Sequence, residues 1–471
     1  MSSDSEQQPQ IVSAESALPR QVSEAVSEYQ AKPGTIDTDT RLASAGETEA
    51  MWPGRPPRRS VMRSLARSDA DTKSRKEAAA YRGSSATSHT RRDLLTGDWT
   101  IFAPKRDQRP NDYESDKQPS VATAAEHPAF EHSTFERPDV DAACPFCAGA
   151  ENRTPEAVWS AKLGDQTTTP LDSAATRFAG PAVEVVPGEQ ANWDVRVVPN
   201  KFPAVSPCDA EKGGHVDRHN LFPITDVVGG HEVIVESSLH AESITQYDPA
   251  MVYMTLLAFR DRIRHWRQVR GINYISVFKN CGPEAGASLR HSHSQLIATS
   301  LMPHHVRTTL LRCEHHRART GCTLACDLLR AELAERSRVI DRTDSFVAFC
   351  PFASRFGGMI RLTSVEHQPH FDRMTETSLD QLSSFLWRVL CWVNEAFPGK
   401  AFNYLLHTCP PGGQQPEAFQ WSLDVFPRLN KTAGFEWSCD CMINSLLPET
   451  AALRYREIAR RHDPRNVLLT R

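Results

Sequence analysis

The chain lacks a long apolar run, a strong net charge and any cysteine before Cys144. No run is long enough to cross a bilayer, so we expect no transmembrane helix and no membrane partner. A formal net charge of -4 over 471 residues gives no broad basic surface, which argues against a nucleic-acid partner. The N-terminus carries acidic residues where a secretory signal has an apolar core, so we expect a cytoplasmic protein.

Phenylalanine is absent from residues 1–88, which are dense in Ser, Ala, Glu, Gln, Pro and Arg. Such a composition buries too little apolar surface to offset the entropy lost when the backbone is ordered. We therefore predict a disordered tail over 1–88. Order is expected to begin near Arg92, where residues 94–103 are typical of a β-hairpin with its turn at 96–98.

The most informative motif is a His-x-His-x-Gln run formed by His291, His293 and Gln295. It follows a strand-like segment, 274–278, and a loop, 280–288, that contains two glycines. In an extended segment side chains alternate between faces, so the three motif residues share one face. The glycines allow backbone N–H groups to approach an anion closely. The pattern suits a metal ligand, a nucleophile and a phosphate hydrogen-bond donor, although a half-buried polar strand would give the same residues.

The chain after residue 140 repeats one order of elements twice. Each copy has a cysteine pair, two strands, an amphipathic helix, a third strand, a loop with Gly or Pro, and a fourth strand. Divergent duplication explains this order, and it predicts an α+β fold of two tandem units, each an antiparallel sheet with packed helices. The predicted units are 89–306 and 307–471. Their expected helices are 249–269 and 378–396, and their expected strands are 195–198, 231–236, 274–278 and the motif segment in the first unit, and 345–349, 359–362, 403–406 and 419–425 in the second.

Cys144 and Cys147 form a Cys-x-x-Cys pair, a spacing that suits two thiolates on one tetrahedral zinc ion. In a chain with 12 cysteines and no export signal, such pairs hold metal more often than they form disulfides. His240, at the end of a predicted strand, and His291 supply the two further ligands in this prediction. A redox dithiol is the weaker alternative, because no helix N-terminus obviously follows to lower a thiol pKa.

With His291 on zinc, His293 is free to act as a nucleophile toward phosphorus. Gln295 and Ser288 are expected to donate hydrogen bonds to the non-bridging oxygens, and Asn280 to fix the loop or a second oxygen. The alternative interpretation of His293 is a buried, hydrogen-bonded histidine without a catalytic role.

Several motifs in a fixed order cover nearly everything after residue 92. On these motifs the chain resembles the galactose-1-phosphate uridylyltransferase family, a two-copy branch of the histidine-triad superfamily, with features similar to its ADP-glucose phosphorylase branch. The motifs are Leu95–Trp99, Arg106–Pro110, Cys144–Cys147, Arg196–Ala204, Asn280–Gln295, Phe426–Leu429, Ala433–Glu436, Asn444 and Pro448–Glu449.

The resemblance implies two histidine-triad-like units, a homodimer and a covalent mechanism. In this mechanism His293 takes a nucleoside monophosphate from a nucleotide sugar and passes it to a sugar phosphate. By the resemblance, the site residues are His293 and Gln295 for catalysis, Arg106, Arg109, Asn200, Asn280 and Ser288 for the substrate, and Cys144, Cys147, His240 and His291 for structural zinc.

Two departures from the family pattern bear on function. Gln420 and Ser422 stand where the first unit has its two histidines, so a second complete metal site is not expected, although a cysteine pair and His367 remain. Ser292 lies between the two motif histidines, and a serine at this position resembles the ADP-glucose phosphorylase branch. The uridylyltransferases more often have proline there.

Uridylyl transfer from UDP-glucose to a hexose 1-phosphate is the leading functional hypothesis at this point. One alternative is an ADP-glucose phosphorylase, which uses orthophosphate as the acceptor. Another is a zinc-stabilised nucleotide-binding protein without turnover. A dinucleotide hydrolase is less expected, because single-copy relatives carry a further histidine where this chain has Ile297.

Overall fold

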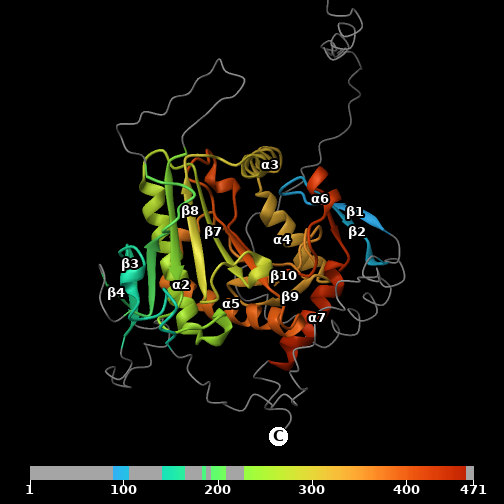
Figure 1. Ribbon diagram of the computed structural model, residues 1–471. Helices are drawn as coiled ribbons and strands as arrows, with labels where there is room; N and C mark the ends of the chain where they lie inside the picture. The colour runs from blue at the N-terminus through green and yellow to red at the C-terminus, as the bar shows by residue number, and fades with distance from the viewer. Residues whose placement is uncertain (1–87, 106–139, 165–182, 187–192, 208–226, 463–471) are drawn as a thin grey trace, which may run out of the picture. The chain divides into compact units, whose positions relative to one another are not determined.

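The computed structural model describes residues 88–105, 140–164, 183–186, 193–207 and 227–462 (Figure 1). The predicted disordered tail lies outside the described residues except for residue 88, and Arg106 and Arg109 lie outside them too. No helix in the described part of the chain is long and apolar enough to span a membrane.

An eleven-stranded sheet runs through the described chain, and all of its neighbouring strands pair antiparallel. The strand order is β4-β3-β5-β6-β8-β7-β12-β13-β11-β10-β9. The strands are β3 (Trp159–Leu163), β4 (Val183–Val186), β5 (Val195–Pro199), β6 (Gly229–Val235), β7 (Tyr274–Cys281) and β8 (His293–Thr299) in the first half, and β9 (Val339–Arg342), β10 (Phe346–Phe349), β11 (Ile360–Ser364), β12 (Phe402–His407) and β13 (Ser422–Pro427) in the second.

The two halves of this sheet repeat one order of elements, as predicted. In the first half β5, β6, helix α2 (Pro249–Gln268), β7 and β8 follow one another. In the second half β10, β11, helix α5 (Glu376–Ala396), β12 and β13 do the same. The observed fold is therefore an antiparallel sheet with packed helices, as the predicted fold class requires.

The halves meet where β7 pairs with β12, with Asn280 opposite Asn403 and Phe278 opposite Leu405. One continuous sheet therefore replaces the separate sheet that we predicted for each unit. Without this pairing both strands would be edges with unpaired backbone groups, so joining the halves removes two edges. The division into units at 306 and 307 remains a proposal.

Helices α2 and α5 pack against each other and share one apolar core with the sheet (Figure 1). α2 begins at Pro249, where the Asp248 side chain accepts the N–H of Ala250 and caps the helix. Val252, Leu256 and other residues one turn apart are buried along its inner face. α2 shares its apolar core with Leu296 and Ala298 of the motif strand, which alternate with His293 and Gln295. The helix therefore covers the face of the sheet opposite these two motif residues.

A hairpin of β1 (His89–Arg92) and β2 (Trp99–Phe102) forms a second, three-stranded sheet with β14 (Met442–Asn444). The predicted hairpin is confirmed, but its first strand lies earlier than expected. The reason is that Asp93 Oδ1 accepts the N–H of Leu95 at 2.7 Å and starts the turn there.

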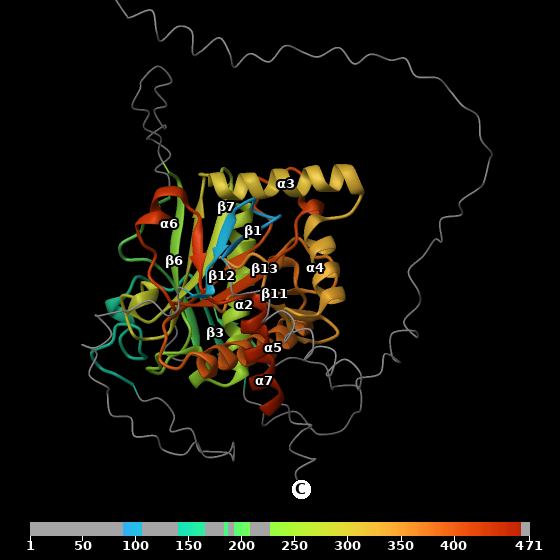
Figure 2. The same cartoon turned by 90° about the vertical axis from the view of Figure 1, so that its right-hand side faces the viewer.

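The remaining helices were not expected from the sequence. Figure 2 shows α3 crossing the top of the view and α4 following below it. They are α3 (His304–Thr320), α4 (Leu324–Glu335), α6 (Gly434–Cys439) and α7 (Pro448–Arg461), with short 3-10 helices at Glu151–Arg153, Ile244–Gln246, Pro283–Ala285, Phe371–Arg373 and Pro416–Ala418.

Candidate active site and metal centre

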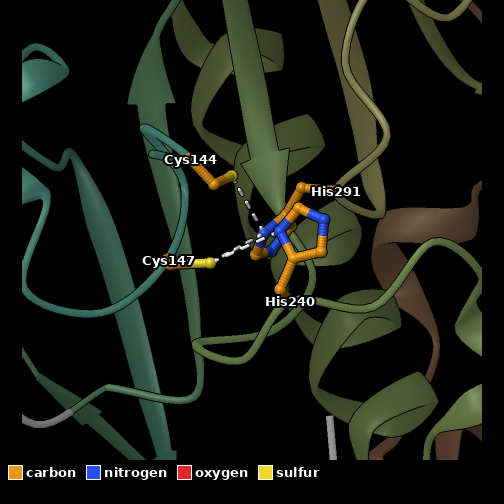
Figure 3. Close-up of side chains that lie close together, drawn as sticks. All are labelled: Cys144, Cys147, His240 and His291. Carbon is orange, nitrogen blue, oxygen red and sulfur yellow. Dashed lines mark hydrogen bonds between the residues drawn. The ribbon is translucent and has the colours of Figure 1, made fainter. Parts of the chain in front are cut away.

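Two cysteines and two histidines from three separate segments converge at one end of β6 and β8. Cys144 and Cys147 lie in the turn before β3, His240 follows β6, and His291 precedes β8 (Figure 3). Their ligand atoms all lie within 4.8 Å of one another. Cys144 Sγ lies 3.5 Å from His291 Nδ1, and Cys147 Sγ lies 3.5 Å from His240 Nδ1 and 3.6 Å from His291 Nδ1.

The protonation of this cluster suits a metal ion. The Nε2 atom of His291 lies 3.0 Å from the Ser237 carbonyl oxygen, which can only accept, so Nε2 carries the proton and the Nδ1 lone pair faces the sulfurs. Burial lowers the pKa of His291 to about 4, which keeps the ring neutral. Burial also raises the pKa of Cys147 to about 11, so a bound cation would have to displace the thiol proton. Two sulfurs and two imidazole nitrogens could hold a metal ion here.

His293 opens β8 next to this cluster and is 6% exposed. Its Nδ1 atom lies 2.8 Å from the His291 carbonyl oxygen, so Nδ1 carries the proton and Nε2 keeps its lone pair. Burial lowers the pKa of His293, and the nearby charge of Lys279 adds to this effect. A neutral imidazole with one lone pair held in a fixed direction is the form that a nucleophile requires.

The sequence prediction that the motif is one strand needs a correction at its first residue. β8 begins at His293, and His291 lies in a bend before the strand. The bend is held because the Ser292 N–H donates to the Ala241 carbonyl at 2.7 Å. His291 is thereby turned to the metal cluster, while the alternation of faces holds only from His293 onward.

A buried polar network lies behind the motif strand, on the side of the helices. Lys279 and Glu236, which are 1% and 0% exposed, form an ion pair there. Lys279 Nζ also donates to Ser292 Oγ at 2.8 Å and to the His293 carbonyl at 3.3 Å. Ser294 Oγ lies 2.7 Å from the Tyr404 hydroxyl, which joins the network from the second half. Sequence reasoning missed these residues; the available signal was a lysine on the inward face of an otherwise apolar strand.

Gln295 lies two residues beyond His293 and contacts a histidine that sequence reasoning also missed. Its Oε1 atom lies 2.8 Å from Nε2 of His231 on β6. Nearby, Asn200 Oδ1 accepts the N–H of Phe202 at 2.8 Å, which folds the end of β5 toward the same region. His231 therefore lies close to both Gln295 and Asn200, two residues that were predicted separately for the site.

Two other predicted substrate residues lie at the end of β7 and after it: Asn280 is still in the strand, so the predicted loop begins later than residue 280, and Ser288 lies in the loop before β8. Asn280 Oδ1 accepts from Asn403 Nδ2 at 2.9 Å, so this amide links the end of β7 to β12 of the second half. Gly282 has φ +87°, and an added Cβ there would lie 2.8 Å from the Ala401 Cβ, so this turn requires glycine. Ser288 is exposed in the loop. The positions of Arg106 and Arg109 lie outside the described residues.

The counterpart positions in the second half are engaged in protein contacts. His367 Nε2 donates to the Phe419 carbonyl at 2.7 Å, and Gln420 Nε2 donates to Ser364 Oγ at 2.8 Å. Asp424 forms a two-point ion pair with Arg361 at 2.7 Å. Within the described ranges, the only gathered set of three or more metal-ligand side chains is the one in the first half.

The comparison with known proteins now identifies the family. Residues 225–466, just over half of the chain, match the family model described as "Domain of unknown function (DUF4921)". The chain belongs to this family. It is also similar to proteins of the galactose-1-phosphate uridylyltransferase type, so the predicted resemblance is confirmed.

Two curated relatives illustrate the similarity of this DUF4921 family member. It is 29% identical over 378 residues to the ADP-glucose phosphorylase of Arabidopsis thaliana, with 78% of this chain and 92% of the relative covered. It is 23% identical over 235 residues to the galactose-1-phosphate uridylyltransferase of Thermotoga maritima, with 48% of this chain and 73% of the relative covered.

Solved structures of the same two kinds of protein are also similar to this chain. The crystal structure of the Arabidopsis thaliana ADP-glucose phosphorylase with bound ADP-glucose matches with a TM-score of 0.59 and 28% identity, covering 79% of this chain and 99% of that one. A uridylyltransferase structure matches with a TM-score of 0.53 and 21% identity, covering 64% and 95%, which is evidence for the fold alone.

Proposed function

We propose that this protein is a nucleotidyltransferase that works through a covalent histidine intermediate and acts as an ADP-glucose phosphorylase. The observation that carries the proposal is His293, whose Nδ1 proton is held by the His291 carbonyl at 2.8 Å so that Nε2 keeps its lone pair. The similarity to the Arabidopsis thaliana ADP-glucose phosphorylase over 92% of that relative supports the choice of donor and acceptor. This choice reverses the order of the two hypotheses that the sequence motifs gave.

The chemistry proceeds in two displacements. His293 Nε2 attacks the α-phosphorus of ADP-glucose, the phosphorus–oxygen bond to glucose 1-phosphate breaks, and glucose 1-phosphate leaves. An oxygen of orthophosphate then attacks the same phosphorus, the phosphorus–nitrogen bond breaks, and ADP leaves with His293 neutral again. Donors aimed at the phosphoryl oxygens stabilise the charge that develops, and we assign this role to Gln295 and Ser288.

The other assigned roles follow the family resemblance. Arg106 and Arg109 would contact phosphates, Asn200 would lie near the nucleoside, and Asn280 would shape the phosphate loop. Zinc held by Cys144, Cys147, His240 and His291 would be structural. It would fix His291, whose carbonyl accepts the Nδ1 proton of His293. We also propose two histidine-triad-like units over 89–306 and 307–471, a homodimer and a cytoplasmic location.

Uridylyl transfer from UDP-glucose to a hexose 1-phosphate is the second candidate. The similarity to the Thermotoga maritima uridylyltransferase favours it, since that relative shares 23% identity over 73% of its length. The same His293 step serves both reactions, so only the base and the acceptor distinguish them.

The test is to trap and weigh the covalent adduct. Purified protein is incubated with ADP-glucose or UDP-glucose without acceptor, and intact-protein mass is measured. ADP-glucose is expected to add one adenylyl group, and orthophosphate is expected to release it as ADP. His293→Asn should abolish the adduct, whereas His316→Ala, on α3, should form it at the parent's rate. A uridylyl adduct released by hexose 1-phosphate would favour the second candidate, and the absence of any adduct in the parent would refute both.

A further inference from the structure

His231 lies between the loop after β5 and the motif strand β8. It is half-buried on β6, on the face of the sheet that also carries Gln295, because β6 pairs with β8 with Val233 opposite Gln295 and His231 opposite Ile297. Its ring makes contacts on both sides. Nδ1 lies 3.2 Å from the backbone nitrogen of Ala204, and Nε2 lies 2.8 Å from Gln295 Oε1.

The backbone contact decides which ring nitrogen carries the proton. The N–H of Ala204 can only donate, so Nδ1 of His231 accepts and is unprotonated. In the neutral ring the proton is therefore on Nε2, and Nε2 donates to Gln295. The Asn200 amide nitrogen also lies 3.2 Å from Nε2, but two donors cannot form a hydrogen bond, so this is only a close contact.

The same logic orients the amide of Gln295. A donor at 2.8 Å requires an oxygen, so the Gln295 carbonyl oxygen faces His231 and its NH2 group faces the opposite way. This NH2 group donates no hydrogen bond to any of the described residues. Without His231 the amide could flip, and an oxygen could then face the anionic substrate.

We propose that His231 is a positioning residue that holds Gln295 with its NH2 group toward the phosphoryl oxygens of the substrate. The inference rests on the proposed function of His293 and Gln295 and adds a residue that no motif contains. The donor that fixes the His231 tautomer is the backbone N–H of Ala204, in the segment that begins with Asn200, so the orientation of Gln295 depends on how that segment is folded.

The test is a double-mutant cycle on the single-turnover rate of adduct formation with ADP-glucose. His231→Leu removes both contacts and is expected to slow adduct formation about tenfold, the worth of one neutral hydrogen bond, with little change in the half-saturating donor concentration. Gln295→Ala is expected to slow it roughly a hundredfold or more. Adding His231→Leu to Gln295→Ala should then change the rate less than about twofold, because His231 has no amide left to orient.

His231→Gln is the conservative variant, since its amide can accept from Ala204 and donate to Gln295. It should recover most of the rate lost in His231→Leu. Zinc content, measured on every variant, reports folding independently of turnover. Equal losses from His231→Leu in both backgrounds, or no rescue by glutamine, would overturn the inference while the proposed function stands. A parent protein that forms no adduct would instead defeat the proposed function, and this result precedes any comparison of variants.

Discussion

In three histidines of this site, His231, His291 and His293, a backbone group rather than a carboxylate determines which ring nitrogen carries the proton. The Ser237 carbonyl accepts from Nε2 of His291, and the His291 carbonyl accepts from Nδ1 of His293. In His231 the Ala204 N–H donates to Nδ1, which leaves the proton on Nε2. A backbone group cannot exchange donor and acceptor roles, so each tautomer is fixed without a charged partner. A carboxylate partner would raise the pKa of the ring and favour imidazolium, which neither binds metal nor attacks phosphorus. Burial lowers the pKa of His291 and of His293, so these two imidazoles stay neutral while the backbone determines which nitrogen carries each proton.

Another histidine should make the fold sensitive to acid. His370 is 6% exposed, and burial, with the charges of Arg267 and Arg373, lowers its pKa to about 4. The unfolded chain takes this proton near the ordinary pKa of about 6.5, so between these values the unfolded state binds more protons and stability falls as pH falls. His370→Gln is expected to reduce the loss of unfolding free energy between pH 7 and pH 5 by about 2 kcal/mol.

Urea denaturation at the two pH values measures this effect. The matched control is His315→Gln, because His315 is exposed on α3 and its replacement removes a histidine without removing a buried ring. Equal acid sensitivity in His370→Gln and the parent would contradict the expected role of this ring.

At the scale of elements, the buried ion pair on β7 is expected to hold the motif strand in place. Lys279 bonds Glu236, Ser292 and the His293 carbonyl, all without access to water. Lys279→Met would leave the Glu236 carboxylate buried without its charge partner, so we expect a loss of about 3–5 kcal/mol in unfolding free energy. Arg290 and Glu242, 83% and 58% exposed, form a nearby ion pair at the surface. Arg290→Ala is expected to cost less than about 1 kcal/mol.

Equilibrium unfolding in urea measures both variants. A cost for Lys279→Met as small as that of Arg290→Ala would mean that Glu236 finds another partner or takes up a proton. The double variant Glu236→Gln/Lys279→Met tests the cause directly. If it loses less unfolding free energy than Lys279→Met alone, the cost comes from the unpaired Glu236 carboxylate.

The elements most accurately predicted from the sequence are those with local signals. The helix predicted over 249–269 is observed over Pro249–Gln268, because the Asp248 cap and Pro249 mark its start and the apolar periodicity marks its length. His231 could not be found in this way. It belongs to no motif, and only the pairing of β6 with β8 brings it to Gln295, from which it is far in the sequence. The join of β7 to β12 is likewise a long-range contact that no local pattern encodes.

At the scale of the whole described chain, one sheet has two unequal halves that repeat one order of elements. In the first half His291 lies two residues before the start of β8 and faces two cysteines. In the second half Gln420 lies two residues before the start of β13, and its amide donates to Ser364 and Thr363. The predicted loss of ligands in the second half therefore has a structural counterpart, since the replaced side chain now satisfies hydrogen bonds inside the fold.

The two halves should consequently differ in metal content. We expect elemental analysis of the purified protein to find zinc bound by the first half alone, because His367 already donates to the Phe419 carbonyl and Gln420 replaces the further histidine. Cys144→Ser should remove the zinc and lower the melting temperature, since the cluster ties the turn before β3 to β6 and β8. Cys326→Ser, in the cysteine pair of the second half, is the matched control and should retain the zinc. A second equivalent that disappears in Cys326→Ser would show that the second half also assembles a metal site, and the asymmetry argued from Gln420 would then be wrong.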